Sequence, residues 1–362
     1  MSGNFSKVKI SDIAKRAGVS AGTVDRVIHN RGEVAAKTRE KVLAIIREMD
    51  YQPDILASTL ASKRNVRLAA LLPEADINNP FWQSPFDGLV AAWDEIKHFG
   101  VSLKTYTFTY HDEASFCNQL EIIALDQPAG LAIAPVFGTS AAKYLNSSPF
   151  DKIPVVCLNT LADGLGQVSF IGQDPMSSGR VAAKLLDFGL DENAEIFIIN
   201  IMSEKGGNTH IMSREKGFRD YFLQKGNREE ERIRSIHVNI PDNNPMDIEE
   251  AFARGEVINQ KSLCASKGIF VTNSKVFHVA KFMEQCKFSN TKLVGYDLLE
   301  QNCNYLKKGA IDFLIGQKPF EQGYKSITSL FQLVVMKKQL PGKQLLPIDI
   351  ITKENIDFYI NQ

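Results

Sequence analysis

Apolar residues near the N-terminus recur at the spacing of two short helices joined by a tight turn. The first helix would be capped by Ser11 and would end at Gly18, which can adopt a left-handed backbone conformation. Ser20 would cap the second helix. The predicted buried positions of the two helices are Ile13, Ala14, Ala17, Val24, Val27 and Ile28. The positions of the second helix expected to face solvent are Ala21, Gly22, Asp25, Arg26 and His29.

A third amphipathic helix is predicted from about Lys37. Its apolar face would consist of Val42, Leu43, Ile45, Ile46 and Met49. Three such helices within about 40 residues, with a glycine in the turn, are typical of a helix-turn-helix unit. We therefore expect a small all-α domain over residues 1–52, built to lay one helix against nucleic acid.

A short segment separates this domain from the rest of the chain. Pro53 breaks the third helix, and Asp54 could cap a further short helix that ends near Ser62. A helix of this length is unstable alone in water, so we expect it to fold only against another surface. Residues 53–64 are therefore interpreted as a hinge helix and linker.

The remainder of the chain alternates short apolar runs with amphipathic stretches. The runs predict strands at 68–72, 101–108, 130–134, 154–158, 168–171, 196–201, 268–271, 293–296 and 311–315. Helical patterns fill most of the gaps, for example at 85–99, 177–186 and 212–223. Such alternation indicates an α/β domain with doubly wound parallel sheets. This many strands exceeds a comfortable single sheet, so we expect two lobes within residues 65–362.

Charge is distributed unevenly between these regions. The whole chain carries 42 Lys and Arg against 42 Asp and Glu, but basic residues predominate in the first 64 positions and acidic residues in the remainder. Charge alone would also fit a solvated surface helix, whereas charge and helical pattern together favour nucleic acid. Neither a signal peptide nor a run of 18 apolar residues is found, which indicates a cytoplasmic protein without a membrane partner.

Motifs for catalysis or cofactor binding are not indicated. The five cysteines are dispersed and never form C-x-x-C, so we interpret them as reduced core residues rather than metal ligands or a disulfide. The segment Gly18-Val-Ser-Ala-Gly22 fits the hydrolase motif G-x-S-x-G, but a helix rather than a strand precedes Ser20. We therefore expect no enzyme activity, no metal and no cofactor.

Polar and aromatic residues follow several predicted strands at their carboxyl ends, where ligands bind in sheets of this kind. Each residue alone is as well explained as a turn former, but the recurrence favours a polyhydroxylated ligand. The residues are Phe81, Trp82, Asn159, Asn273, Asp297 and Gln317.

Several motifs resemble the LacI/GalR family of transcription regulators. In the N-terminal region they are Asp-Ile-Ala-Lys-Arg-Ala-Gly-Val-Ser, Thr-Val-Asp-Arg-Val, Ala-Lys-Thr-Arg-Glu-Lys-Val and Tyr-Gln-Pro-Asp. Further along they are Val-Gly-Tyr-Asp and the Ile-Gly-Gln at 315–317. The resemblance implies that the body is the family's periplasmic-binding-protein-like effector domain, with an N-lobe at about 66–168 and 318–346 and a C-lobe at about 169–317 and 347–362.

The resemblance also implies which residues contact DNA. In the second helix these are Ser20, Ala21, Gly22, Thr23 and Arg26, where Arg26 would bind a guanine edge. Lys37 and Thr38 would contact phosphates, and Leu60 of the hinge helix would wedge into the minor groove at the operator centre. Two such heads related by a two-fold axis imply a homodimer on a near-palindromic operator of double-stranded DNA.

For the effector, the resemblance adds Arg214 to the strand-end residues Asn159, Asn273, Asp297 and Gln317. Arg214 opposite Asp297 would bind vicinal hydroxyls, and Phe81 or Trp82 would stack on a sugar ring, although core packing is the alternative for Trp82. We expect a ligand-responsive regulator, a repressor, whose small-molecule effector is a carbohydrate, with a nucleobase as second choice. A periplasmic-type solute-binding protein is the alternative; it would share the body but would not need the basic head.

Overall fold

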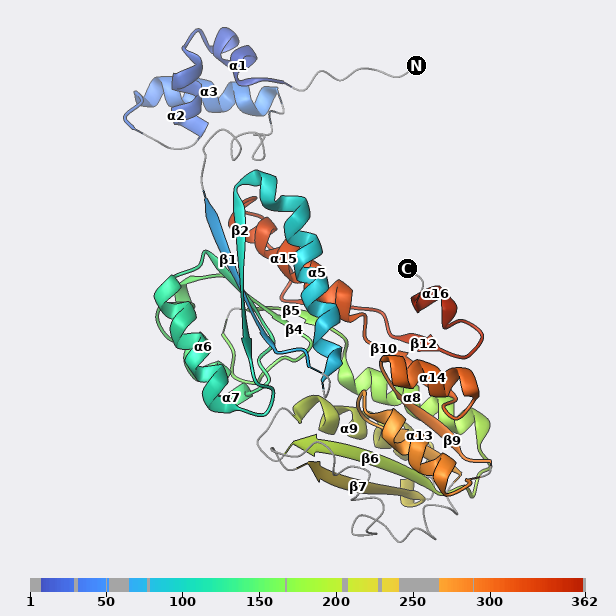
Figure 1. The fold of residues 1–362 in the computed structure, drawn as a ribbon. Helices are drawn as coiled ribbons and strands as arrows, with labels where there is room; N and C mark the ends of the chain where they lie inside the picture. The colour runs from blue at the N-terminus through green and yellow to red at the C-terminus, as the bar shows by residue number, and fades with distance from the viewer. Residues whose placement is uncertain are drawn as a thin grey trace, which may run out of the picture. The chain divides into compact units, whose positions relative to one another are not determined.

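The computed structural model of the chain describes residues 8–28, 32–49, 51, 65–76, 79–166, 168–203, 208–226, 230–240, 267–288 and 290–360. The chain forms two compact units, Met1–Ser62 and Lys63–Gln362 (Figure 1). The predicted hinge helix with Leu60 lies outside the described residues, as does His29.

The N-terminal unit is the predicted three-helix domain. It consists of α1 (Ile10–Ala17), α2 (Ala21–Ile28) and α3 (Ala36–Glu48). Gly18 ends α1 with φ +69°, and the Ser20 hydroxyl accepts the Thr23 amide N–H at 3.1 Å at the start of α2. The prediction that Ser11 caps α1 is wrong, because the helix begins one residue earlier. Its first turn is closed by Asp12, whose carboxylate accepts the Lys9 N–H at 2.9 Å.

The core of this unit is formed where the three apolar faces meet. Ile13, Val24 and Val42 are fully buried, one from each helix. Leu43 is 38% exposed, so its predicted place in the core is wrong. Because α3 directs Val42 and Ile45 inward, Leu43 is turned toward solvent at about 100° from Val42.

The second unit contains two six-stranded sheets. The first, in the order β11-β5-β4-β3-β1-β2, consists of β1 (Val66–Pro73), β2 (Val101–Phe108), β3 (Gly130–Ile133), β4 (Val155–Leu158), β5 (Val168–Gly172) and β11 (Lys343–Leu345). The second, in the order β12-β10-β9-β8-β6-β7, consists of β6 (Ile196–Ser203), β7 (Ile233–Ile240), β8 (Gly268–Val271), β9 (Lys292–Tyr296), β10 (Phe313–Gly316) and β12 (Asp349–Ile351). All the predicted strands are present, whereas β7, β11 and β12 lie outside the prediction. Among the described strands only the pair β10 and β12 is antiparallel.

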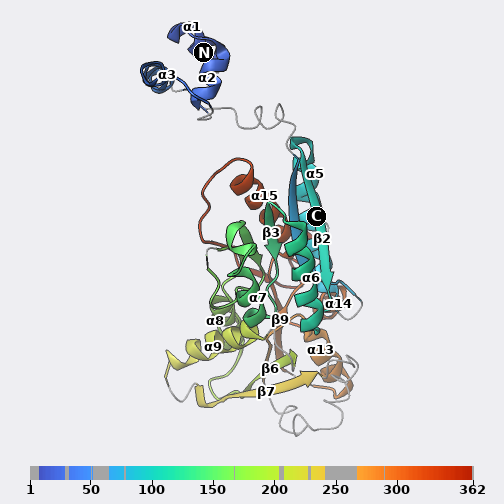
Figure 2. The same ribbon diagram turned by 90° about the vertical axis from the view of Figure 1, so that its left-hand side faces the viewer.

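Helices cover both faces of each sheet, as Figures 1 and 2 show. In the first lobe α5 (Gln83–Ile96) and α15 (Pro319–Val334) lie on one face, and α6 (Glu113–Asp126) and α7 (Gly138–Leu145) on the other. In the second lobe the pairs are α8 (Pro175–Gly189) with α9 (Thr209–Leu223), and α13 (Val276–Gln285) with α14 (Glu300–Lys308). The short α16 (Asp357–Ile360) follows β12. None of the helices in the described ranges combines the length and apolarity needed to cross a bilayer.

The central strands read as continuous apolar runs because both of their faces are buried. In β6, Ile196 and Ile198 belong to the core beneath α8 and α9, while Phe197 and Ile199 belong to the core beneath α13. A strand between two helical layers has no solvent face and so needs no polar alternation.

The chain crosses between the lobes after β5, after β10 and after β11. The first crossing was expected near residue 168, but Val168–Gly172 pairs in parallel with β4 and so belongs to the first sheet. One side chain ties the three crossings together. The Gln173 amide donates to the carbonyl oxygens of Gly316 and Pro347, both at 2.7 Å.

Glycines bring the paired helices of each lobe into backbone contact. A Cβ on Gly179 of α8 would overlap the Arg214 carbonyl of α9, and one on Gly217 would overlap the Met176 carbonyl of α8. The first lobe has the same close helix contact, since Gly88 of α5 lies against the Phe320 carbonyl and Gly323 of α15 lies against the Pro85 carbonyl. Neither helix pair can accept a larger residue at these points without moving apart.

We predict that Gly179→Ala destabilises the second unit by about 1–3 kcal/mol, because the new methyl group forces α8 away from α9. Thermal unfolding of the purified protein measures this. Gly342→Ala is the matched control, since nothing lies within 4 Å of the added Cβ there. Equal melting temperatures for the two variants would show that the helix pair tolerates the methyl group.

Candidate functional site

The exposed face of α2 carries the predicted DNA-reading residues. Ser20, Ala21, Gly22 and Arg26 are exposed, and Thr23 is half-buried with its hydroxyl 2.9 Å from that of Ser20. Within the described residues, no acidic side chain pairs with the Arg26 guanidinium. An ion pair on the protein surface would be the other role for an exposed arginine at this position, and the described residues do not supply one.

The start of α3 presents the predicted phosphate contacts beside this helix. Lys37 is exposed and Thr38 is half-buried in the first turn of α3. Ser20 follows a helix and opens another, so it occupies a helix cap and not the strand-to-helix turn of a hydrolase.

Arg214 is the centre of the second candidate site. It extends from α9 to the carboxyl ends of the second sheet and is only 4% exposed. Its Nη1 donates to the Thr272 carbonyl oxygen at 2.7 Å, and its Nη2 to Gln317 Oε1 at 2.6 Å. The guanidinium carbon lies 3.8 Å from the ring centroid of Tyr296, a stacked arrangement that suits a weakly hydrated cation.

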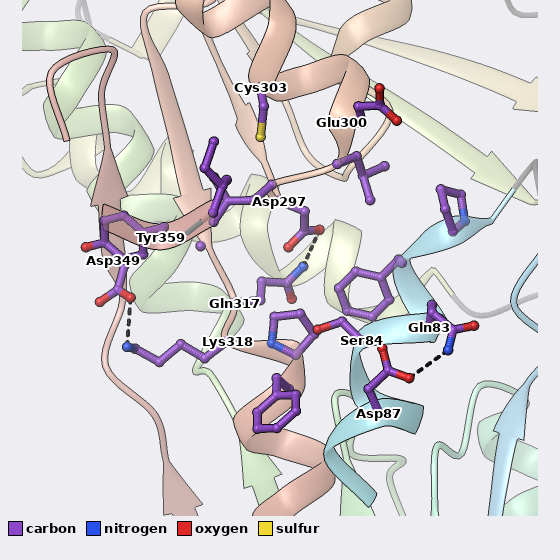
Figure 3. Close-up of a pocket in the computed structure, with 18 of the residues that line it drawn as sticks. Gln83, Ser84, Asp87, Asp297, Glu300, Cys303, Gln317, Lys318, Asp349 and Tyr359 are labelled. Carbon is purple, nitrogen blue, oxygen red and sulfur yellow. Dashed lines mark hydrogen bonds and ion pairs between the residues drawn. The ribbon is translucent and has the colours of Figure 1, made fainter. Parts of the chain in front are cut away.

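Asp297 and Gln317 complete a chain of polar contacts with Arg214. Gln317 Nε2 donates to Asp297 Oδ2 at 2.8 Å, so the two predicted residues meet directly (Figure 3). Burial raises the pKa of Asp297 to about 7, although the Arg214 charge and the Gln317 hydrogen bond act in the opposite direction. Two buried atoms of this chain have no hydrogen-bond partner among the described residues, namely Asp297 Oδ1 and Arg214 Nε. A ligand hydroxyl can donate a hydrogen bond to such an acceptor or accept one from such a donor.

Asn273 and Asn159 hold their own loops. Asn273 Nδ2 donates to the Ile201 carbonyl oxygen at 2.7 Å, and its Oδ1 accepts the Lys275 N–H at 3.1 Å. Asn159, at the end of β4, is half-buried with φ +64°, and its Oδ1 accepts the Thr160 hydroxyl at 3.3 Å. The described hydrogen bonds join neither Asn273 nor Asn159 to the Arg214 chain, so they link three of the predicted effector residues, Arg214, Gln317 and Asp297.

The first lobe contributes an aromatic cluster. Phe81 and Trp82 are both buried and meet edge to face with ring centroids 5.1 Å apart. Trp82 also lies 6.4 Å from the ring of Tyr110. Burial raises the pKa of Tyr110 to about 12, and the charge of Arg214 on the other lobe acts against that rise. The aromatic cluster therefore faces Arg214 across the gap between the lobes.

A cavity of about 960 Å³ adjoins this gap (Figure 3). Phe81, Asp297 and Gln317 line it, together with residues of α14 and the start of α15. Arg214, Asn273, Asn159 and Trp82 are not among its lining residues, so the cavity reaches only one edge of the predicted site. Its polar rim includes Lys318, which pairs with Asp349 at 2.8 Å.

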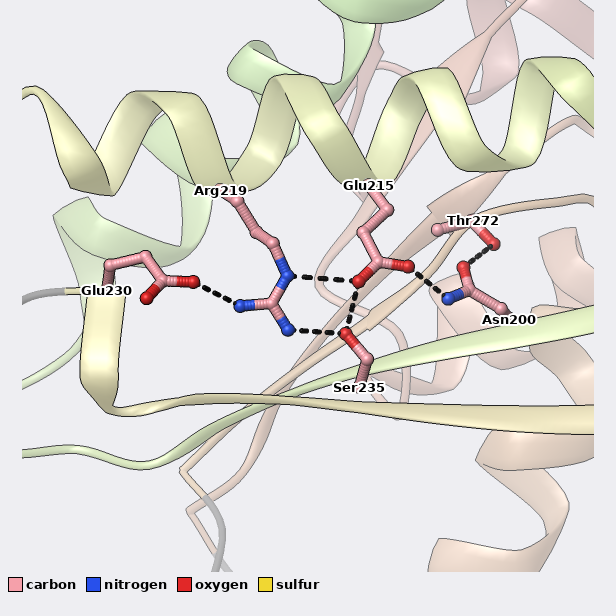
Figure 4. Close-up of polar contacts among 6 residues, drawn as sticks. All are labelled: Asn200, Glu215, Arg219, Glu230, Ser235 and Thr272. Atoms are coloured by element: carbon pink, nitrogen blue, oxygen red, sulfur yellow. Dashed lines mark hydrogen bonds and ion pairs between the residues drawn. The ribbon is translucent and has the colours of Figure 1, made fainter.

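A polar network joins Thr272 to Asn200 and Glu215 (Figure 4). The Thr272 hydroxyl donates to Asn200 Oδ1 at 2.9 Å, and the Asn200 amide donates to Glu215. Arg219 Nε donates to the same carboxylate at 3.0 Å. Burial by itself would raise the pKa of Glu215, but hydrogen bonds from Ser235, Arg219 and Asn200 hold it below its ordinary value. The network fixes Thr272, whose carbonyl oxygen holds Arg214.

Sequence reasoning did not identify Tyr110 or Lys275 as site residues. Tyr110 follows β2, at the same end of the first sheet as Phe81. Because ligands bind beyond the carboxyl ends of strands in such sheets, its position after a predicted strand was a usable signal. Lys275 follows Asn273 by two positions in a loop already chosen for Asn273. No group of three or more His, Cys, Asp or Glu suited to a metal ion occurs in the described part of the chain.

Known proteins share both units of the chain. Residues 9–54 match the family described as bacterial regulatory proteins, lacI family, and residues 70–338 match the periplasmic binding protein domain. The HTH-type transcriptional regulator DegA of Bacillus subtilis is 30% identical over 222 residues, which cover 61% of this chain and 62% of that protein. A ribose operon repressor of Halalkalibacterium halodurans is 28% identical over 216 residues, covering 58% of each chain. The chain thus matches about three fifths of the length of these relatives.

A solved structure supports the same assignment. A candidate LacI transcriptional regulator from Bacteroides fragilis superimposes with a TM-score of 0.72 and 27% identity, covering 82% of this chain and all of that one. A helix-turn-helix unit is thus followed in the chain by a two-lobed domain of the periplasmic-binding-protein type. The chain belongs to the family of the periplasmic binding protein domain, whose model matches residues 70–338, and its residues 9–54 match the lacI family of bacterial regulatory proteins. The two relatives are named as a transcriptional regulator and a repressor, in agreement with the expectation that the protein is not an enzyme.

We predict that Asp297 makes the stability of the empty protein depend on pH. Its pKa is about 7 when folded, against an ordinary value of 3.8. The folded state therefore binds more protons than the unfolded state between these values, so the free energy of unfolding falls as pH rises through this range. Asp297→Asn should remove this dependence and should raise the melting temperature by several degrees at about pH 8 but not at about pH 4.

Differential scanning calorimetry across that pH range measures the effect. Asp163→Asn, in an exposed turn of the first lobe, is the matched control and should follow the wild-type profile. Parallel profiles for Asp297→Asn and wild type would contradict the raised pKa.

Proposed function

We propose that the protein is a transcription regulator, a repressor, that binds a near-palindromic operator as a homodimer and responds to a sugar or sugar derivative between its lobes. The observation that carries the effector assignment is the buried chain Arg214–Gln317–Asp297, which leaves Arg214 Nε and Asp297 Oδ1 open. A pair of vicinal hydroxyls can form hydrogen bonds with both atoms, because each hydroxyl can donate one hydrogen bond and accept another. We assign the activity to the cytoplasm because its DNA partner lies there.

The surroundings of this chain also favour a sugar. Aromatic rings of Trp82 and Tyr110 approach from the other lobe, and sugar rings stack their apolar faces on such groups. Trp82 is 3% exposed in this arrangement of the lobes, so it would receive a ligand only on opening of the gap. The ribose operon repressor among the relatives is named for a sugar, which supports the class of effector but not its identity.

The mechanism we propose is a shift between two arrangements of the lobes. An effector that contacts Asp297 on one lobe and the aromatic cluster on the other favours one arrangement, and the crossings tied by Gln173 are the segments that must adjust. If the effector binds the two arrangements with affinities about 100-fold apart, the coupling free energy is about 2.7 kcal/mol per site. That is sufficient to change operator occupancy substantially.

DNA recognition would rest mainly on Arg26. Ala21 and Gly22 can offer only a methyl contact or a close backbone approach, whereas the exposed Arg26 can donate two hydrogen bonds to a guanine edge. Lys37 and Thr38 would orient the unit through phosphate contacts.

We expect Arg214→Ala to abolish the response to effector and to leave operator affinity within about threefold of wild type. Truncation of a buried, hydrogen-bonded charge costs about 2–5 kcal/mol of binding, so effector affinity should fall about 100-fold. The effector is first found by a thermal-shift screen of sugars, sugar acids, sugar phosphates and purines, and its affinity is then measured by calorimetry. Arg180→Ala is the control, because Arg180 is a more exposed arginine that pairs with Asp220. An equal loss of operator binding and effector binding in Arg214→Ala would refute the division of roles.

We expect Arg26→Ala to lower affinity for the specific operator about tenfold or more while effector affinity stays unchanged, because one bidentate base contact is worth about 1–3 kcal/mol. The operator is obtained by selection from random duplexes, and binding is followed by fluorescence anisotropy. Arg47→Ala in the last turn of α3 controls for loss of one positive charge. Unchanged operator binding in Arg26→Ala, or no selected sequence at all, would favour the alternative of a solute-binding protein.

A further inference from the structure

A second cation lies beside the Arg214 chain and has no role so far. Lys275 stands at the N-terminus of α13, immediately after the loop that follows β8. The loop is held by the Asn273 side chain, which bridges the Ile201 carbonyl oxygen at 2.7 Å and the Lys275 N–H at 3.1 Å. The backbone of Lys275 is therefore fixed, and its side chain is half-buried.

The ammonium group of Lys275 has no hydrogen-bond or ion-pair partner among the residues that the structure describes. Within the described residues, no carboxylate lies at ion-pair distance and no group accepts a hydrogen bond from Nζ. Burial lowers the pKa of Lys275 to about 8, and the Asp76 carboxylate on the first lobe acts in the opposite direction. The Asp76 carboxylate is close enough to raise the pKa of Lys275, but its Oδ1 already accepts a hydrogen bond from the Asn79 N–H at 2.8 Å. A partly dehydrated cation without a counter-ion is costly unless a ligand supplies one.

Arg214 is a second cation on this side of the gap. Arg214 is permanently charged and its Nε is open. The helix α13 directs the positive end of its dipole toward Lys275. Against these stands Asp297, which with a pKa of about 7 is only partly ionised near neutral pH. Lys275 and Arg214 together therefore exceed the charge of the two carboxylates that act on them, Asp76 and the partly ionised Asp297.

We propose that the effector is an acidic sugar, one that carries a carboxylate or a phosphate, and that Lys275 is the residue that binds the acidic group. Asp297 and Arg214 then take the ring hydroxyls. The inference rests on the proposed function, and it narrows the effector class from sugars in general to sugar acids and sugar phosphates. A charge-assisted hydrogen bond from Lys275 selects the acidic sugar over its neutral counterpart.

The competing role for Lys275 is an ion contact with Asp76 that draws the lobes together. The two roles predict opposite effects of Asp76→Asn. If Lys275 binds the acidic group of the ligand, Asp76→Asn removes a carboxylate that competes for the ammonium group, and acidic sugars bind as well as before or better. If Lys275 instead holds the two lobes together through Asp76, Asp76→Asn weakens the binding of every ligand just as Lys275→Gln does.

The experiment compares matched neutral and acidic sugars on the full-length protein. The pairs are D-glucose with D-glucuronate, D-gluconate and glucose 6-phosphate, D-galactose with D-galacturonate, and D-ribose with ribose 5-phosphate. Thermal shift identifies the ligands, and calorimetry at low and high salt gives their affinities for wild type, Lys275→Gln, Asp76→Asn and the control Lys184→Gln. Lys184 is an exposed lysine of α8 in the same lobe.

We expect at least one acidic sugar to bind about tenfold or more tightly than its neutral counterpart, with a preference that weakens in high salt. Lys275→Gln should remove the preference without affecting the neutral sugar, and Lys184→Gln should leave it intact. Whether the carboxylate or the phosphate member binds distinguishes the two sources of the acidic group.

Three results would overturn the inference. They are neutral sugars that bind as tightly as acidic ones, a preference that survives Lys275→Gln, and acetate or inorganic phosphate alone that binds as tightly as the acidic sugar. In each of these cases the proposed function stands if a sugar still releases or recruits operator DNA. Failure of every sugar in the panel to bind would instead remove the proposed function itself.

Discussion

The buried guanidinium of Arg214 is the contact on which the proposed effector site depends. A charge that is 4% exposed needs hydrogen bonds from the protein, and here they come from the ends of two different strands through Thr272 and Gln317. Tyr296, at the end of a third strand, stacks beneath it. The loops after β8, β9 and β10 are therefore held in register by one side chain, and the open atoms of Asp297 and Arg214 are a consequence of that arrangement.

The support of Arg214 extends through the second lobe in both directions. Behind it, Thr272 is fixed by Asn200 and Glu215, a network in which the buried carboxylate is satisfied by its neighbours (Figure 4). Along its own helix, the Arg214 carbonyl lies against Gly179 of α8, where a methyl group would not fit. A cation held this rigidly loses little further freedom when a ligand binds, which favours affinity. The crossings bonded by Gln173 leave movement between the lobes as the remaining freedom.

The agreement between sequence and structure is greatest where local chemistry is decisive. Gly18 and Ser20 act as predicted because the left-handed turn and the helix cap depend on the residue itself. The predictions that Ser11 caps α1 and that Leu43 is buried failed because neighbouring residues determine both outcomes. Asp12 closes the first turn of α1, and Val42 occupies the core position next to Leu43. The strand β7 was missed although its residues alternate, and β11 and β12 are edge strands of three residues each, too short for a pattern to form.

The sequence by itself determined the three-helix domain, the parallel sheets and the strand ends at which Asp297, Asn273 and Gln317 stand, because hydrophobic periodicity and capping are local properties of the chain. Only the tertiary structure decided which of these residues meet. Arg214 and Gln317 are 103 positions apart, and their contact depends on how α9 packs on the sheet. The same packing leaves the Lys275 ammonium group without a partner in the described part of the chain and brings Tyr110 within reach of the Arg214 charge, because burial and charge are set by elements that are distant in the chain.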